Sequence, residues 1–191
     1  MKRCRLIFSG AGGQGILMAA RLLAEAAVLH EGLNAVQSQV YGPAARGGAS
    51  RSDVIISDED ILFPKVTQPN VVVSITQEAY NHYAGLVRPG GLLLTDRHFV
   101  TQETKVDARQ VELDMYAAVV AQIGRPIVCN VCMLGALIRF IPLVQPASLE
   151  AVLEARVPPD LLTANKQALE LGGTLADAFL KERGIMSIQL W

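Results

Sequence analysis

The stretch that decides the fold lies near the start of the chain, at Ser9–Gly15, with the sequence SGAGGQG. It follows a short apolar run at 5–8, and it precedes a run with helical apolar periodicity at 16–29. This order is typical of a first β-strand, a tight turn and a first α-helix. The stretch therefore predicts that the chain begins with a strand–turn–helix unit.

Gly10, Gly12 and Gly15 have the G-x-G-x-x-G spacing, which lets backbone N–H groups at a helix N-terminus approach an anion closely. A dinucleotide site usually has an acidic residue about 20 residues further on, at the end of the second strand. Residues 34–40 contain none, and Glu31 comes too early, in the turn after the helix. The glycines could instead only allow strand and helix to pack closely. A third interpretation is a site shared with another part of the chain or with another chain.

A second glycine-rich stretch, at 41–51, follows the second predicted strand and contains Arg46 and Arg51. Arginine presents a planar set of donors that suits phosphate and carboxylate groups. Both glycine-rich stretches follow strands that a parallel sheet would end at one edge, where open α/β sheets bind ligands. The alternative is an ordinary surface loop with solvated arginines.

Strands and helices alternate along the rest of the chain. Strands are predicted at 6–9, 35–41, 53–57, 70–75, 92–95 and 111–113, and helices at 14–30, 77–87, 114–123, 130–140, 148–155 and 159–182. This alternation predicts an α/β fold: a three-layer sandwich with a mostly parallel sheet and helices on both faces. We find no repeat or linker, so we expect a single domain, 1–191.

Local signals add detail to these elements. Thr76 and Asp114 each stand where a helix N-cap is expected. Gly172 and Gly173 should loosen the middle of the last helix, because glycine has low helix propensity. The tail 185–191 is apolar for a terminus, so we expect it to dock onto this chain or onto a partner.

The composition limits the class of protein. Of 191 residues, 51% are hydrophobic and only 18% are charged, against about 25% in ordinary domains. The mean hydropathy is +0.31, but no apolar run is long enough to span a membrane, and no signal peptide is recognisable. We therefore expect a cytoplasmic protein with apolar partner surfaces. The net charge of −1 gives no sign of nucleic-acid binding.

Catalytic or metal-binding residues are sparse. Cys129 and Cys132 have C-x-x-C spacing, but they lie in an apolar run, and Cys4 alone is too few to complete a metal site. Buried structural thiols are the favoured interpretation, with a redox pair as the alternative. Asp96 and His98 follow a central strand, yet one carboxylate does not make an acid–base pair. The residues alone thus predict an anion-binding sheet edge without complete catalytic machinery.

Several motifs, taken together, closely resemble the gamma subunit of 2-oxoacid:ferredoxin oxidoreductases over nearly the whole chain. They are, in order, Gly10–Gly15 (GAGGQG), Gln39–Gly48 (QVYGPAARGG), Ser50–Ser57 running into an acidic turn and Pro64, Arg88–Gly91 (RPGG), and Asn130 with Leu134 and Gly135. The first two motifs are far more specific as a pair than alone. Ala44 stands where many relatives have Glu, so we assign no charged role there.

The resemblance implies a subunit of a larger enzyme that is inactive as an isolated chain. That complex decarboxylates a 2-oxoacid on thiamine diphosphate, passes electrons through Fe–S clusters to ferredoxin, and transfers the acyl group to coenzyme A. Thiamine diphosphate and the clusters would belong to the alpha, beta and, where present, delta subunits, and this chain alone would bind no cofactor. We expect 2-oxoglutarate as the substrate, with pyruvate, branched-chain oxoacids and indolepyruvate as the other choices.

Within that complex, the resemblance leaves two roles for the glycine-rich loops. They could help to form the coenzyme A site, with backbone donors and arginines at Gly10, Gly12, Gly13, Gln14, Gly15, Arg46, Gly47, Gly48 and Arg51. They could instead pack against the thiamine-binding subunits and have a purely structural role. A free-standing nucleotide-binding oxidoreductase is the third alternative.

Overall fold

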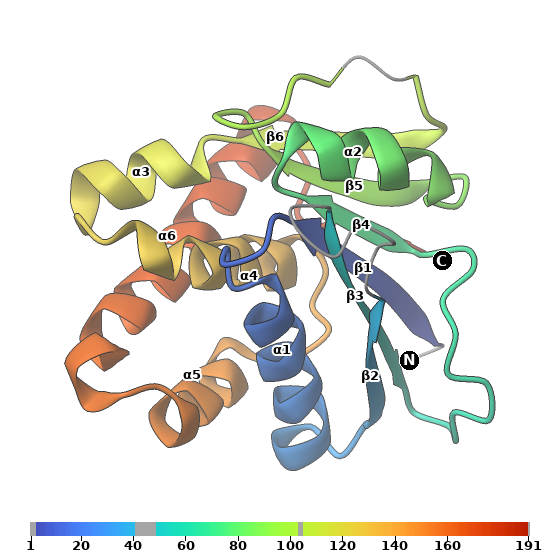
Figure 1. Cartoon of the computed structure of the whole chain (residues 1–191), viewed down its shortest axis with the longest axis horizontal. Helices are drawn as coiled ribbons and strands as arrows, with labels where there is room; N and C mark the ends of the chain where they lie inside the picture. Colours follow the sequence, from blue (N-terminus) through green and yellow to red (C-terminus); the bar gives the residue numbers. More distant parts are fainter. Residues whose placement is uncertain (1–2, 41–48, 103–104, 191) are drawn as a thin grey trace.

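The computed structural model describes residues 3–40, 49–102 and 105–190. A six-stranded sheet forms its middle layer, in the order β2-β3-β1-β4-β5-β6 (Figure 1). The strands are β1 (Cys4–Gly10), β2 (Asn34–Val40), β3 (Ser50–Ser57), β4 (Val71–Ser74), β5 (Gly91–Asp96) and β6 (Ala108–Leu113). β1, β4, β5 and β6 pair in parallel, whereas β3 is antiparallel to both β1 and β2. The mostly parallel α/β sheet is confirmed, with β3 reversed within the described part of the sheet.

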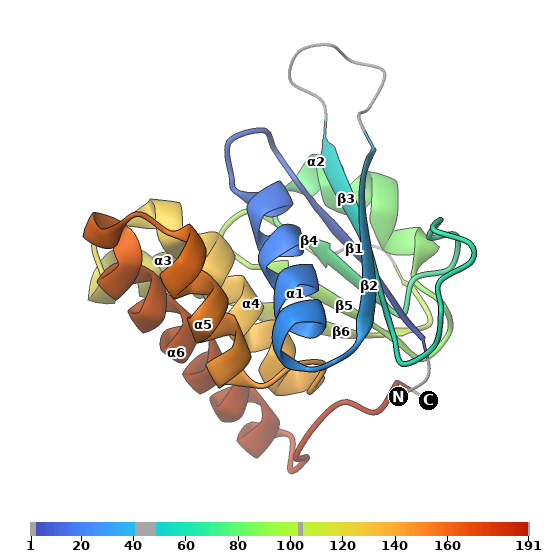
Figure 2. The ribbon, with the colours of Figure 1, turned by 90° about the horizontal axis from the view of Figure 1, so that it is seen from below.

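Helices cover both faces of the sheet, which gives the predicted three layers. They are α1 (Ile16–His30), α2 (Gln77–Tyr83), α3 (Met115–Gln122), α4 (Cys129–Phe140), α5 (Pro146–Arg156), α6 (Pro159–Glu182) and the short 3₁₀ helices η1 (Ala84–Leu86) and η2 (Pro126–Val128). Figure 2 shows α1 and α3 to α6 on one side of the sheet and α2 on the other.

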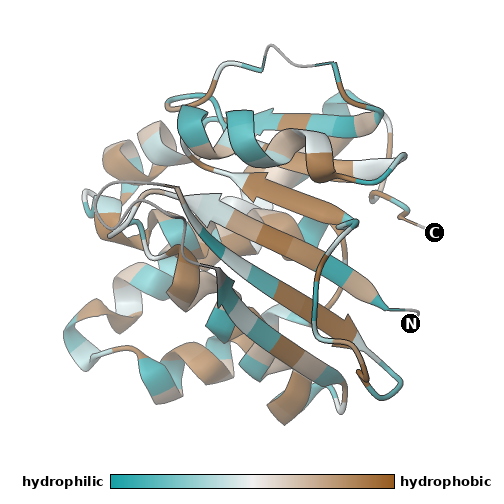
Figure 3. Ribbon diagram, turned by 45° about the vertical axis from the view of Figure 1, so that its right-hand side comes forward, coloured by the Kyte–Doolittle hydropathy of each residue, from teal (hydrophilic) through white to brown (hydrophobic). Residues whose placement is uncertain are grey.

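The core consists of two clusters, one on each face of the sheet. Leu6 and Phe8 of β1 point into the larger cluster with α1, α4 and α6, whereas Ile7 points toward α2. The central strands are apolar along most of their length (Figure 3), as expected for strands buried on both faces.

α4 and α6 approach each other closely through two glycines. A Cβ atom on Gly135 would lie 2.0 Å from the carbonyl oxygen of Leu169, and one on Gly172 would lie 1.8 Å from that of Cys132. The expectation that Gly172 and Gly173 loosen the last helix is therefore wrong, because α6 continues through both and Gly172 is needed for close packing.

Two further local expectations can be checked. Thr76 caps α2, since its hydroxyl accepts a hydrogen bond from the Ala79 N–H at 3.2 Å. The C-terminal tail docks onto this chain: the Ile188 N–H donates to the carbonyl oxygen of Phe140 at 2.8 Å, and the side chains of Ile188 and Leu190 are buried.

Candidate functional site

The glycine turn, which we define as residues Gly10–Gly15, joins β1 to α1 and is closed by its own side chain and backbone. The Ala11 N–H donates to Oε1 of Gln14 at 2.7 Å, and the Gln14 N–H donates to the carbonyl oxygen of Ala11 at 3.3 Å. A Cβ atom on Gly10 would lie 2.7 Å from Oε1 of Gln14 and 2.8 Å from the Ile75 side chain. Gly10 is therefore explained by packing within the chain.

Gly15 is explained by both its conformation and its surroundings. Its φ of 73° is left-handed, and it stands at the N-cap of α1. Nδ2 of Asn130, in the first turn of α4, donates to the Gly15 carbonyl oxygen at 3.2 Å, and a Cβ atom on Gly15 would lie 2.5 Å from that nitrogen. Sequence reasoning quoted Asn130 only as part of a motif and did not predict this contact.

Gly12 and Gly13 behave differently, because both are exposed and neither has an atom within 4 Å of the place where a Cβ would stand. Gly13 needs glycine because its φ is 86°, whereas Gly12 does not have a positive φ. Close packing of strand and helix therefore accounts for Gly10 and Gly15 but leaves Gly12 unexplained within the described chain.

A pocket of about 510 Å³ opens beside the turn. It lies between the start of α1, the η2–α4 connection and the start of α6, and Ser50 of β3 also lines it. Gly12, Gly13 and Gly15 form its polar side, near the first turn of α1, where N–H groups lack partners within the helix. Ile127, which is 68% exposed, and Leu161 contribute to its apolar side. Such a pocket offers backbone donors to an anion and an apolar wall to a longer ligand.

The ends of β1 and β2 lie at the same edge of the sheet, because Gly10 pairs with Ser50, and Val40 pairs with Arg51. Segment 41–48, which follows β2 and precedes β3 in the sequence, lies outside the described residues, as do the site residues Arg46, Gly47 and Gly48 that it contains. Only Arg51 of the predicted second half of the site can therefore be placed.

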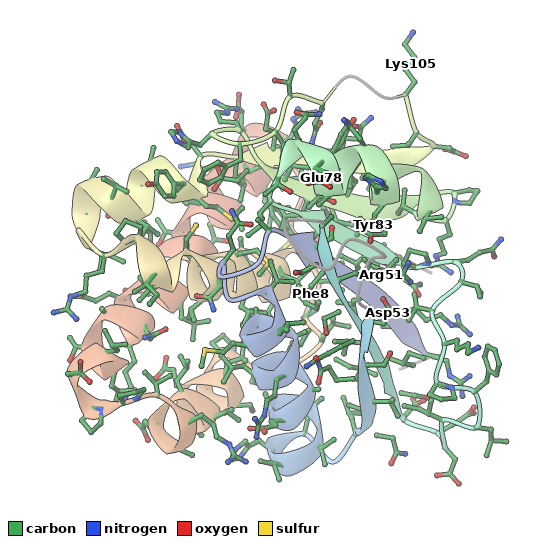
Figure 4. The ribbon with its side chains drawn as sticks, viewed as in Figure 1. Phe8, Arg51, Asp53, Glu78, Tyr83 and Lys105 are labelled. Atoms are coloured by element: carbon green, nitrogen blue, oxygen red, sulfur yellow. The ribbon has the colours of Figure 1, made fainter. Side chains whose placement is uncertain are left out.

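Arg51 faces the opposite side of the sheet from the pocket. Its Nε and Nη2 atoms donate to the two carboxylate oxygens of Asp53 at 2.5 and 2.8 Å, and Nη2 also donates to the carbonyl oxygen of Val66 at 3.1 Å. The guanidinium stacks on Tyr83 at 5.4 Å from the ring centroid, and Figure 4 shows Arg51, Asp53 and Tyr83 gathered on the α2 side. The structure thus does not bring Arg51 to the glycine turn, and Asp53 already binds its guanidinium.

The sheet order also bears on the dinucleotide interpretation. In the dinucleotide-binding fold the second strand lies directly beside the first, so that its terminal acidic residue reaches the ribose. Here the antiparallel strand β3 separates β2 from β1, and β2 ends without an acidic residue. The glycine turn is therefore not set in the framework that a free-standing nucleotide-binding oxidoreductase needs.

Asp96 and His98, at the end of β5, have structural partners. The Asp96 carboxylate accepts hydrogen bonds from the His98 N–H at 2.9 Å and the Tyr116 N–H at 2.7 Å, and the His98 ring stacks on Tyr116. Burial raises the pKa of Asp96, which these two hydrogen bonds oppose. Asp96 thus accepts a hydrogen bond from a free backbone N–H in the first turn of α3. Asp114 stands at the N-cap of α3, but its side chain makes no capping hydrogen bond, contrary to expectation.

The cysteines are buried thiols. Cys4 and Cys132 are fully buried, Cys129 is partly buried, and all three are free. Burial raises the pKa of Cys129 to about 12, and the nearby Asp96 carboxylate adds to this rise. Within the described ranges, no group of three or more His, Cys, Asp or Glu side chains could hold a metal ion. None of the described helices is both long and apolar enough to cross a membrane.

Comparisons with known proteins show the family to which this chain belongs. Residues 5–175 match the model of the family described as pyruvate ferredoxin/flavodoxin oxidoreductase. The 2-oxoglutarate synthase subunit KorC of Methanocaldococcus jannaschii is 40% identical, over 91% of this chain and 94% of that protein. The solved keto/oxoacid ferredoxin oxidoreductase gamma subunit of Geobacter sulfurreducens is 37% identical, with a TM-score of 0.86 over 93% of this chain and 98% of that chain.

A second solved structure shares the fold within a longer chain. It is the 2-oxoglutarate:ferredoxin oxidoreductase from Magnetococcus marinus, with 2-oxoglutarate, coenzyme A and succinyl-CoA bound. The match covers 93% of this chain and 32% of that one, with a TM-score of 0.82 and 22% identity. The resemblance seen in the motifs is thereby confirmed: the chain belongs to the pyruvate ferredoxin/flavodoxin oxidoreductase family, as a subunit of the gamma type.

Proposed function

We propose that this chain is the gamma subunit of a 2-oxoglutarate:ferredoxin oxidoreductase. The relative from Methanocaldococcus jannaschii supports this choice, because it matches along most of both chains and is a 2-oxoglutarate synthase subunit. The complex would convert 2-oxoglutarate to succinyl-CoA and transfer the electrons to ferredoxin. Thiamine diphosphate and Fe–S clusters would be held by alpha, beta and, where present, delta subunits, and the cytoplasm remains the expected location.

The substrate is tested by purifying the complex anaerobically through a tag on this chain. Coenzyme A-dependent dye reduction is then measured with 2-oxoglutarate, pyruvate and branched-chain oxoacids. The proposal predicts that thiamine- and cluster-binding subunits co-purify and that 2-oxoglutarate gives the highest kcat/KM. A higher kcat/KM for pyruvate would overturn the assignment of 2-oxoglutarate as the substrate. A chain that purifies alone and binds a nucleotide would favour a free-standing nucleotide-binding oxidoreductase.

Within this complex we propose that the glycine turn forms part of the coenzyme A site. The observation that carries this role is that Gly12 lines the 510 Å³ pocket, although nothing within the described chain requires a glycine there. A glycine at such a position lets a ligand or a partner backbone approach closely. The first turn of α1 would supply N–H donors to a phosphate or carbonyl group, with Gly10, Gln14 and Gly15 fixing the turn.

Arg46 would supply the positive charge for the coenzyme A phosphates, and Gly47 and Gly48, which follow it in the sequence, would belong to the same part of the site. Arg51 is not included in this role, because Asp53 already binds its guanidinium on the other face. Replacing Arg46 with Ala should raise the KM for coenzyme A without weakening the complex. If Arg46→Ala instead weakens assembly and leaves the KM for coenzyme A unchanged, the loops have the structural role of packing against the thiamine-binding subunits.

A further inference from the structure

A second pocket lies at the opposite end of the strands from the glycine turn. The parallel strands β4 and β5 begin there. Its volume is about 620 Å³, and the residues around Arg88 and Lys105 line it together with η1. The proposed coenzyme A role makes no use of this end of the strands, and neither the family match nor the relatives' names assign it a function.

The backbone around Arg88 is fixed by a tight turn. The Gly91 N–H donates to the Arg88 carbonyl oxygen at 2.9 Å, and Gly90 has a φ of 72°. Pro89 and Gly90 thus occupy the two central positions of a type II turn, where proline and glycine are favoured. The turn explains the proline and the glycines of this RPGG motif, but its first position accepts most residues and does not require arginine.

Arg88 is half-buried, and no carboxylate in the described part of the chain forms an ion pair with it. Its Nε atom is buried and has no hydrogen-bond acceptor in the described part of the chain. Asp107 lines the same pocket, yet no ion pair joins these two described residues. The Arg88 charge does reach the buried Cys4 thiol, where it partly opposes the burial that raises the pKa of Cys4 to about 12. A guanidinium withdrawn from water without a counter-charge is costly, so an anion from elsewhere would stabilise it.

The rim of the pocket indicates what kind of anion fits. Lys105 projects from the loop before β6 and adds a second positive charge (Figure 4). Leu86 is 39% exposed beside Arg88, and Pro89 is exposed next to it. Arginine is enriched at the energetically important centres of protein–protein interfaces, where the surrounding side chains exclude water.

We propose that this pocket is a docking site for a carboxylate side chain, Asp or Glu, from another subunit of the same enzyme complex. The carboxylate would accept hydrogen bonds from the terminal guanidinium nitrogens of Arg88, next to the buried Nε. Lys105 would add electrostatic attraction, and Leu86 and Pro89 would exclude water around the pair. The inference rests on the subunit assignment but not on the coenzyme A role, because the two pockets lie at opposite ends of the strands.

The test is the affinity of this chain for the rest of the complex, measured with Arg88→Gln, Arg88→Lys and wild type. Arg21→Gln is the matched control, since Arg21 is 61% exposed and forms a surface ion pair with Glu25. We expect Arg88→Gln to weaken assembly at least ten-fold, Arg88→Lys to weaken it less, and Arg21→Gln to have no effect. The melting temperature of the isolated chain should not fall in Arg88→Gln, because no carboxylate among the described residues pairs with the arginine.

Three results would overturn the proposal. Unchanged assembly of Arg88→Gln would show that no partner carboxylate binds there. A large loss of stability in the isolated Arg88→Gln chain would show that the arginine acts within its own fold. Arg88-dependent binding of free acetate or phosphate to the isolated chain, with unchanged assembly, would make the pocket a small-anion site. When subunit concentrations are high enough for Arg88→Gln to assemble fully, its KM for coenzyme A should equal that of wild type. This result separates the test of the Arg88 pocket from the test of the glycine turn.

Discussion

The side-chain amide of Asn130 donates a hydrogen bond to the backbone carbonyl of Gly15 at 3.2 Å, and so joins the start of α4 to the start of α1 at the pocket. Gly15→Ala should therefore be costly for two reasons. A left-handed conformation costs a non-glycine residue about 1–2 kcal/mol, and a displaced Asn130 amide would lose a hydrogen bond worth about 1 kcal/mol.

Urea unfolding measures this cost, and Gly32→Ala is the control. Gly32 has a φ of 65°, but a Cβ atom there would meet nothing within 4 Å. We expect Gly15→Ala to destabilise the chain by clearly more than Gly32→Ala. Equal losses would mean that the contact with Asn130 has no energetic weight.

The adjacent glycines of α6 should respond in opposite directions to alanine. Gly172→Ala would place a Cβ atom 1.8 Å from the Cys132 carbonyl oxygen, so α4 and α6 would have to separate, at a cost of roughly 3 kcal/mol or more. Gly173→Ala meets nothing within 4 Å and should stabilise the helix by about 0.5–1 kcal/mol. Thermal unfolding of both variants checks this, and a stable Gly172→Ala would contradict the close helix crossing.

Glu31 should give the stability a measurable acid dependence. Its carboxylate accepts hydrogen bonds from the Ser148 hydroxyl at 2.6 Å and the Gln145 N–H at 2.7 Å, and so ties the α1–β2 turn to the start of α5. These bonds lower the pKa of Glu31 below its ordinary value of 4.5. The contribution is therefore present above pH 4.5 and is lost as the pH falls through the lowered pKa.

The difference in free energy of unfolding between wild type and Glu31→Gln should accordingly be present at neutral pH and disappear in acid. Glu59→Gln controls for the loss of one negative charge in a surface turn. A Glu31→Gln difference that does not change with pH would show that the carboxylate charge is not involved.

The three thiols should be nearly unreactive in the folded chain. Burial raises the pKa values of Cys4 and Cys129 to about 12 and also raises that of Cys132. At pH 8 the thiolate fraction of a thiol with such a pKa is on the order of 10⁻⁴. Iodoacetamide should therefore label native protein slowly and all three cysteines rapidly in guanidinium chloride. Rapid native labelling of Cys129 and Cys132, or a disulfide between them, would restore the redox-pair interpretation.

Much of the fold followed from the sequence, because apolar strands such as 70–75 and the long periodic helix 159–182 give strong signals. The reversal of β3 did not, although the connection from β2 is too short for the crossover that parallel strands need. The predicted strand 53–57 began three residues late, since Ser50 and Arg51 carry no apolar signal.

The site was predictable only where local backbone geometry determines it. The glycine turn is a local motif, whereas the Asn130 contact joins residues 115 positions apart, and no spacing rule predicts it. Arg51 appeared to be a free anion ligand because its pairing with Asp53 depends on strand alternation, which places both side chains on the α2 face. Gly172 appeared to be a helix weakener because its packing partner, Cys132, lies on another helix.

If the glycine turn forms part of the coenzyme A site, Gly12→Leu in the assembled enzyme should weaken the binding of coenzyme A. The backbone accepts a side chain at this position, because Gly12 does not have a positive φ and a Cβ atom there would meet nothing within 4 Å. Ala178→Leu adds similar bulk at an exposed position of α6 as a control. Steady-state kinetics should show a KM for coenzyme A raised about ten-fold, equivalent to about 1.4 kcal/mol, with the KM for the 2-oxoacid and the control unchanged. An intact Gly12→Leu complex with an unchanged KM for coenzyme A would contradict the account.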